Sequence, residues 1–174
     1  MKKITQILSL SILLLFACSM QLSAQKCKFD YNKKDQLTGE QSKGITFSIK
    51  LWWKLGFNRV GNTYYIGMYI NLNGNLRDVI TPDNTLVFKL ANGEIITLHA
   101  NDNFYPTAQV NANQNGVVSR YDAKYDISAE DMQKLASSPI VYVKMGIGGA
   151  RNYDSEFNAK KGEEFQNCAK CILL

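Results

Sequence analysis

The chain has 174 residues, and its 20 lysines and arginines stand against 15 aspartates and glutamates, for a formal net charge of +5. These charges are mixed along the chain rather than clustered, which argues against a nucleic-acid-binding surface. No stretch reaches the roughly 18 consecutive apolar residues of a transmembrane helix. We find no glycine motif for phosphate or dinucleotide binding. We therefore expect no nucleic-acid partner, no transmembrane span and no cofactor.

The first 24 residues have the pattern of a secretory signal peptide. Lys2 and Lys3 form a positive start, residues 7–16 form a short apolar run, and Ala24 ends a stretch of small residues. Cleavage there leaves residues 25–174, the size of one domain with its own core. The pattern predicts export to the periplasm or the extracellular space.

A second processing route is open at Cys18. Leu15 and Ala17 stand where a bacterial lipobox carries its leucine and its small residue, although Phe16 is bulkier than that motif usually accepts. Lipidation of Cys18 would anchor the protein to a membrane. We favour ordinary cleavage, in which Cys18 is part of the apolar run, and keep the lipoprotein as the alternative.

The strongest periodic segment is residues 45–55, where apolar and other residues alternate strictly. Such alternation predicts one half-buried β-strand. Residues 63–72 repeat the pattern, and we expect a four-residue loop, 57–60, to join the two strands as a hairpin. That register keeps both apolar sets on one side of the sheet.

A second hairpin is predicted around Asn92 and Gly93. A three-residue loop, 91–93, with Gly93 in a left-handed conformation, would place Phe88 opposite Ile96 and Leu86 opposite Leu98. We prefer this loop to a two-residue turn because it buries more apolar surface.

The second half of the chain mixes strands and helices. Ser128 can cap a short helix, which Pro139 ends. The elements we expect are a polar loop over 101–116, strands over 117–127 and 140–147, a helix after Ser128, and a last helix over about 157–171. Together these patterns predict a mainly β fold, an antiparallel β-sandwich or curved sheet with two short helices. The strand-helix-strand run keeps an α+β layout as the alternative.

The mature chain has three cysteines, Cys27 near its start and Cys168 and Cys171 near its end. Thiols tend to pair in the oxidising compartments outside the cytoplasm. We expect a disulfide between Cys27 and Cys171, or Cys168, that joins the two ends of the domain.

Two other chemistries compete for these cysteines. A thiol-disulfide oxidoreductase could use the C-x-x-C of Cys168 and Cys171, but that motif lies at a helix C-terminus, where the dipole raises thiol pKa values. A zinc site would need the lone His99, far along the chain, as its fourth ligand. We therefore expect no metal and no catalytic residue, and leave the question of an enzyme open with binding preferred.

The predicted first hairpin suggests a binding surface. It would place Trp52 opposite Tyr65, with Tyr69 and Lys50 on the same side, away from the core. Aromatic side chains in a row offer rigid contact area with polar tips, as sugar and peptide sites use. The competing interpretation is that another element covers this face and makes the aromatics core.

Overall, the signal peptide ending in Ser-Ala-Gln, the β-rich body and the cysteine-bearing final helix resemble small exported bacterial β-rich proteins of unassigned function. That resemblance implies no activity and no site residues. We predict a non-catalytic binding module of the cell envelope whose partner is a glycan or an envelope protein. The alternatives are the oxidoreductase and a structural subunit of an envelope assembly.

Overall fold

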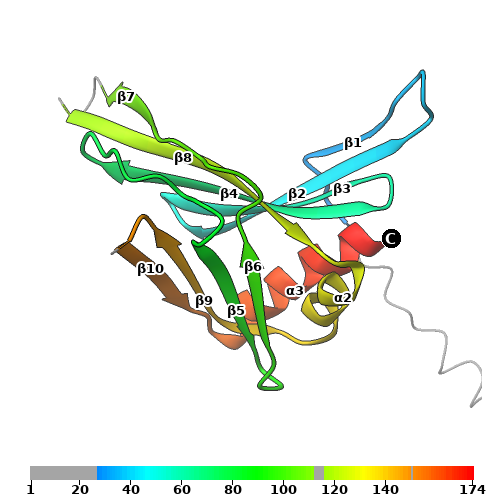
Figure 1. Cartoon of the computed structure of the whole chain (residues 1–174). Coiled ribbons are helices and arrows are strands. Elements are labelled where there is room, and N and C mark those ends of the chain that lie inside the picture. Colours follow the sequence, from blue (N-terminus) through cyan, green and yellow to red (C-terminus); the bar gives the residue numbers. More distant parts are fainter. Residues whose placement is uncertain (1–26, 112–115, 150) are drawn as a thin grey trace, which may run out of the picture.

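The computed structural model describes residues 27–111, 116–149 and 151–174. The predicted signal peptide and Cys18 lie outside these residues. The fold is mainly β, as predicted: within the described residues, ten strands form two antiparallel sheets, accompanied by two helices (Figure 1). Neither helix is long and apolar enough to cross a membrane.

The larger sheet has six strands in the order β1-β2-β3-β4-β8-β7. Their bounds are β1 Tyr31–Lys34, β2 Gln41–Lys50, β3 Trp53–Val60, β4 Thr63–Asn73, β7 Thr107–Asn111 and β8 Gly116–Ile127.

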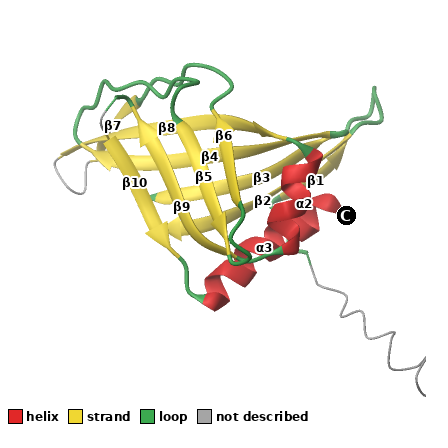
Figure 2. Ribbon diagram, turned by 60° about the horizontal axis from the view of Figure 1, so that its bottom comes forward, coloured by secondary structure: helices red, strands yellow, loops and turns green. Residues whose placement is uncertain are grey.

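The smaller sheet has four strands in the order β10-β9-β5-β6. Their bounds are β5 Thr85–Leu90, β6 Ile95–His99, β9 Ile140–Ile147 and β10 Arg151–Glu156, and the helices are α2 Ala129–Ser137 and α3 Ala159–Leu173. The two sheets curve around one shared interior, and the helices lie side by side at one end (Figure 2). The β8-α2-β9 run carries the chain from one sheet to the other, so the α+β alternative does not hold.

The predicted single strand over 45–55 is wrong, because the chain reverses at Leu51 and Trp52 and returns as β3. A bulge between Ser48 and Lys50 shifts the register just before this turn. The shift puts odd-numbered residues opposite odd-numbered residues, so the apolar set stays on the core side of both strands. The alternation therefore continues through the reversal, and only Leu51, which is 98% exposed, breaks it.

The next turn also differs from the expectation. The predicted loop 57–60 lies inside β3, and the chain turns at Gly61 and Asn62 instead. Gly61 has φ +56°, which suits a two-residue hairpin turn. As a result Tyr65 lies opposite Asn58, and the predicted pairing of Tyr65 with Trp52 is wrong.

The β5–β6 hairpin confirms its prediction. Leu86 pairs with Leu98 and Phe88 with Ile96, and Gly93 has φ +91° in the three-residue loop. The predicted cap also forms: the Asp131 N–H donates to Ser128 Oγ (3.0 Å) at the start of α2.

Three short strands, β1, β7 and β10, were not predicted. Each lies at the edge of its sheet, and the side chains described on them are mostly polar and partly or fully exposed. An edge strand with few core-facing residues has no alternation for a sequence pattern to detect. The expected loop over 101–116 is therefore wrong in part, because β7 pairs with β8.

Helix α3 joins the two sheets through one aromatic ring. The ring centroid of Phe165 lies 4.7 Å from that of Phe57 and 5.4 Å from that of Phe47, both on the larger sheet. The Phe88 ring of the smaller sheet lies 5.5 Å away on another side. Because Phe165 is fully buried, α3 is part of the core rather than a cover.

Candidate functional site

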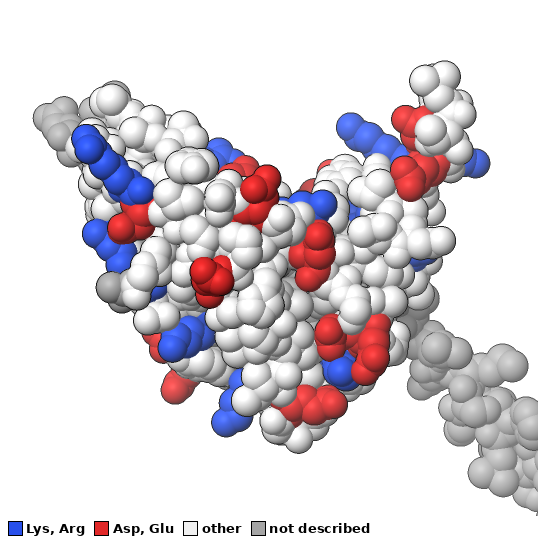
Figure 3. Space-filling model, in the orientation of Figure 1, with Lys and Arg blue, Asp and Glu red and all other residues white. Residues whose placement is uncertain are grey.

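The larger sheet has an outer face that is turned away from the smaller sheet and the helices. In Figure 1 this face points upward, and Figure 3 shows the molecule hollowed there, between the β1–β2 hairpin and the β7–β8 pair. Gly56 and Gly67 are direct partners near the middle of this face, and Gly44 lies one strand away. Three glycines on adjacent strands leave the backbone bare where side chains would normally stand.

Tyrosine rings cover this bare backbone. A Cβ atom added to Gly67 would lie 3.0 Å from the Tyr69 hydroxyl, and one added to Gly56 would lie 3.2 Å from Tyr69 Cε2. The Tyr31 ring covers Gly44 in the same way. Because these glycines have no side chains, the rings of Tyr31 and Tyr69 pack directly against the backbone of the sheet and keep defined positions.

A buried amide locks this arrangement. Asn58 is only 5% exposed, and its Nδ2 donates to the carbonyl oxygen of Gly56 (2.8 Å). Its Oδ1 accepts from the Tyr31 hydroxyl (2.9 Å). Burial above all, followed by a hydrogen bond with Tyr65, raises the pKa of Tyr31, so this hydroxyl stays protonated as a donor.

Next to the glycines, the outer face holds a cleft of about 310 Å³. Trp52 and Tyr69 supply its aromatic surface, from the β2–β3 turn and from β4. The full lining is Thr46, Leu51, Trp52, Lys54, Tyr69, Asn71 and Arg120. This volume lies at the lower end of the range of small-ligand sites, roughly 300–1,000 Å³.

Trp52 is held on three sides. Its ring stacks on Trp53 with centroids 6.2 Å apart, and it meets the edge of Tyr153 at 6.0 Å. The Lys50 ammonium lies 5.3 Å from the Trp52 ring centroid and donates to the backbone carbonyl of Asp154 (3.2 Å). Lys50 therefore ties the β2–β3 turn to the smaller sheet and fixes Trp52, rather than pointing freely at a ligand.

The polar groups of the cleft remain available for binding. Thr46, Asn71 and Lys54 are exposed. Arg120 lies 3.5 Å from Asp122, but both side chains are largely exposed, so the ion pair is weak. Burial, and next the nearby Asp122 carboxylate, raise the pKa of Tyr69, which keeps its hydroxyl protonated.

Tyr65 belongs to the same face but not to the cleft. It stands four residues from Tyr69 on β4, which is about 13 Å along a strand. The Lys124 ammonium lies 4.5 Å from its ring centroid. Of the four residues predicted from sequence, the structure thus brings Trp52 and Tyr69 together, uses Lys50 as their support and sets Tyr65 apart.

Sequence reasoning missed the other lining residues. Thr46 and Lys54 were hidden because the turn at Leu51 was not recognised. Asn71 and Arg120 lie opposite each other on β4 and β8, a pairing that only the sheet order reveals. The signal available in the sequence was the alternation along each strand. It places Thr46, Lys54 and Asn71 between core-facing residues and therefore on the outer face.

A second, more open depression of about 540 Å³ lies on the smaller sheet, lined by Lys89, Val141, Tyr142, Glu156 and Phe157. The Tyr142 hydroxyl is already engaged with Asp154 (3.0 Å). Lys89 and Glu156, of opposite charge, both border it. We consider it the weaker candidate because it is more open, its Phe157 ring is buried and its Tyr142 hydroxyl already has a partner.

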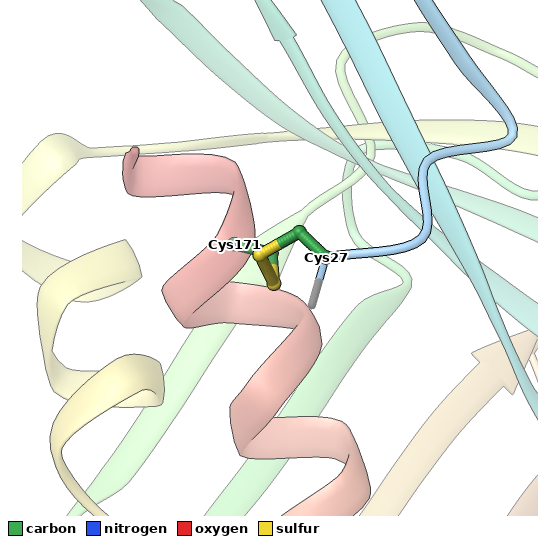
Figure 4. Close-up of a disulfide and its surroundings, with 2 residues drawn as sticks. All are labelled: Cys27 and Cys171. Carbon is green, nitrogen blue, oxygen red and sulfur yellow. A yellow bond between two sulfur atoms is a disulfide. The ribbon is translucent and has the colours of Figure 1, made fainter. Parts of the chain in front are cut away.

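The cysteines form a staple rather than a dithiol. Cys27 is bonded to Cys171, with Cα atoms 5.6 Å apart, which joins the start of the domain to α3 (Figure 4). Cys168 is free, and burial above all raises its pKa to about 11. A thiol with that pKa is almost entirely protonated at neutral pH, which opposes nucleophilic use of the C-x-x-C.

Within the described ranges, no three histidine, cysteine or acidic side chains gather as metal ligands. His99 contacts the backbone carbonyl of Pro82 through Nδ1 (2.9 Å). Neither a family model nor a curated protein nor a solved structure matches this chain. The geometry of the cleft is therefore the basis for any functional conclusion.

Proposed function

We propose that this chain is an exported, non-catalytic binding module of the cell envelope that binds a glycan in the cleft of the outer sheet face. The observation that carries the proposal is the pair Trp52 and Tyr69, which line one cleft from different elements and are both held by their neighbours. Rigid aromatic side chains provide contact area at low entropic cost.

The character of the lining favours a sugar. A sugar ring has an apolar C–H face that packs on aromatic rings, and hydroxyl groups around its edge that need hydrogen-bond partners. Trp52 and Tyr69 suit the first need, while Asn71, Thr46 and the Tyr69 hydroxyl suit the second. A protein partner would use far more surface, about 800 Å² on each side of a stable interface.

Export is supported by two features. Residues 1–24 have the signal-peptide pattern, and the Cys27–Cys171 disulfide suits an oxidising compartment. Both fit a protein that meets glycans at the cell surface or in the periplasm.

The test is glycan binding by the mature, disulfide-bonded protein, first on a glycan array and then by titration calorimetry. Tyr69→Leu removes the aromatic face, the hydroxyl and the ring atoms that cover Gly56 and Gly67. We expect about tenfold weaker binding from this variant. Tyr105→Leu is the matched control, because Tyr105 is 69% exposed and lies outside the cleft lining.

Thermal denaturation of both variants would show that the fold is kept. The proposal fails if the wild-type protein binds no glycan, or if Tyr69→Leu binds as tightly as the control. Conversion of the bound glycan into a new product would show that the protein is an enzyme rather than a non-catalytic binding module.

A further inference from the structure

The cleft has a definite electrostatic character. Of the seven described residues that line it, two are basic, Lys54 and Arg120, and none is acidic. The chain as a whole carries basic and acidic residues in a ratio of 20 to 15, and Figure 3 shows both signs mixed over the visible surface. The two cations thus lie beside two aromatic rings within the lining, while the nearest carboxylates, Asp122 opposite Tyr69 and Asp30 hydrogen-bonded to the Thr46 N–H, lie at its border.

Lys54 has no anionic partner among the described residues. Its cross-strand neighbours are Ser48 on β2 and Tyr69 on β4, which carry no charge. Its side chain is exposed, so the charge is hydrated and free to meet a ligand. A lysine in this setting acts as a point charge that attracts any anionic group.

Arg120 is only loosely engaged. It stands opposite Asn71 on β4 and Thr107 on β7, and its Nη2 lies 3.5 Å from Asp122 Oδ2, two residues along its own strand. At this distance the pair lacks the short, parallel hydrogen bonds of a strong arginine–carboxylate pair. An anionic group of a ligand can form those short, parallel hydrogen bonds with the Arg120 guanidinium, while the Asp122 carboxylate turns toward solvent.

From this arrangement we infer that the ligand is an acidic glycan, whose carboxylate or sulfate group binds between Lys54 and Arg120 while its ring packs on Trp52 and Tyr69. The inference rests on the proposed function and adds the chemical class of the sugar. The anionic group supplies a partner for Lys54 and a closer one than Asp122 for Arg120, and the aromatic rings orient the sugar that carries it.

The experiment compares matched oligosaccharides by titration calorimetry with the mature, disulfide-bonded protein. One pair is oligogalacturonate and its methyl ester, which share the sugar chain but differ in whether the carboxyl groups are charged or carry a neutral methyl ester. A second pair is a sulfated dextran oligosaccharide and unmodified dextran of the same length, which shows whether sulfate can replace carboxylate. In each pair that binds, we expect the acidic oligosaccharide to bind at least tenfold more tightly than its neutral counterpart. Its affinity should fall as the salt concentration is raised.

Single substitutions locate the anion. Lys54→Gln and Arg120→Gln should each weaken binding of the acidic member about tenfold, and much more than they weaken binding of the neutral member, as expected for lost charge-assisted hydrogen bonds. Asp122→Asn should strengthen acidic binding, because it frees Arg120. Lys124→Gln is the matched control, since Lys124 lies over Tyr65, outside the cleft, on the same face.

The outcomes separate the two proposals. Equal binding of acidic and neutral members, or equal effects of Lys54→Gln and Lys124→Gln, would overturn the acidic-glycan inference and leave the binding module standing. Absence of binding to both these pairs and the glycan array would overturn the proposed function itself.

Discussion

The two faces of the larger sheet use the same strands for different purposes. On the inner face, Leu55, Phe57, Ile66 and Met68 are fully buried in the core. The residues that alternate with them on the outer face are Lys54, Gly56, Asn58, Tyr65, Gly67 and Tyr69, with no aliphatic side chain among them. The inner face thus stabilises the fold, while the outer face is free to carry a binding site.

The comparison also shows how an exposed face can be rigid. Inner residues are held by packing from both sides, whereas Tyr69 has the sheet on one side only. Glycine on two neighbouring strands lets its ring lie close to the backbone, and Asn58 holds the adjoining Tyr31 by a hydrogen bond. Order on the outer face therefore comes from missing side chains and buried hydrogen bonds, not from hydrophobic packing.

The largest expected effect is on the inner face. Phe57→Ala removes a fully buried ring that packs against Phe165, and it should lower the free energy of unfolding by about 3–5 kcal/mol. Ser48→Ala, an exposed change on the outer face, should alter it by less than about 0.5 kcal/mol. Urea denaturation of the two variants measures both changes in the free energy of unfolding. Similar changes in the two variants would refute the expected difference between the faces.

Asn58 should be the exception on the outer face. Asn58→Ala leaves the Tyr31 hydroxyl without its acceptor and the Gly56 carbonyl without its side-chain donor. We expect a loss of roughly 1–3 kcal/mol in the same assay. An unchanged denaturation midpoint would mean that solvent satisfies these groups and that the amide does not order the face.

Gly67→Ala tests the tyrosine platform. The new Cβ would lie 3.0 Å from the Tyr69 hydroxyl, so the ring must shift, and ligand affinity should fall with a stability change of about 1 kcal/mol at most. Gly149→Ala is the control, because open space surrounds that position. Equal affinities for the two variants would show that the ring position does not matter.

A smaller and opposite effect is expected at Tyr125 on the inner face. Its hydroxyl is buried with no hydrogen-bond partner in the described structure. Tyr125→Phe removes that unsatisfied group while keeping the ring, so stability should stay level or rise by about 0.5–1 kcal/mol. A clear loss in thermal denaturation would reveal a hydrogen bond that forms in solution.

The last effect is absent at neutral pH and concerns Cys168, which packs partly against the core. Its folded pKa of about 11 lies above the ordinary thiol value of 9.0, so the folded state holds the proton more tightly than the unfolded state. The resulting stability is fully present below pH 9 and is lost as the pH rises from 9 to 11. Cys168→Ala should flatten this alkaline decline in denaturation curves, and an unchanged decline would contradict the assignment.

Local signals explain which elements were predictable. The β5–β6 register followed from a short loop with Gly93 and from alternation on both sides of it. The same kind of alternation concealed the reversal at Leu51, because the bulge near Ser48 kept the core residues in phase. The edge strands β7 and β10 gave no pattern, since they contribute little to the core.

The site was predictable only as a list of residue types. The structure places Trp52 and Tyr69 in one cleft, but the predicted hairpin register that joined them to Tyr65 was wrong. The contributions of Thr46, Lys54 and Arg120 depend on which strands are neighbours, and that information is not local in sequence.

By itself, the sequence determined the fold class, the core-facing residues of most strands, the Ser128 cap and the limited set of possible disulfides, because alternation, turn chemistry and cysteine number are properties of short segments or simple counts. Only the tertiary structure decided where β2 ends, that Cys171 rather than Cys168 meets Cys27, and which side chains share the cleft. These outcomes depend on cross-strand register and on the docking of α3, where one bulge or one helical turn changes which atoms meet.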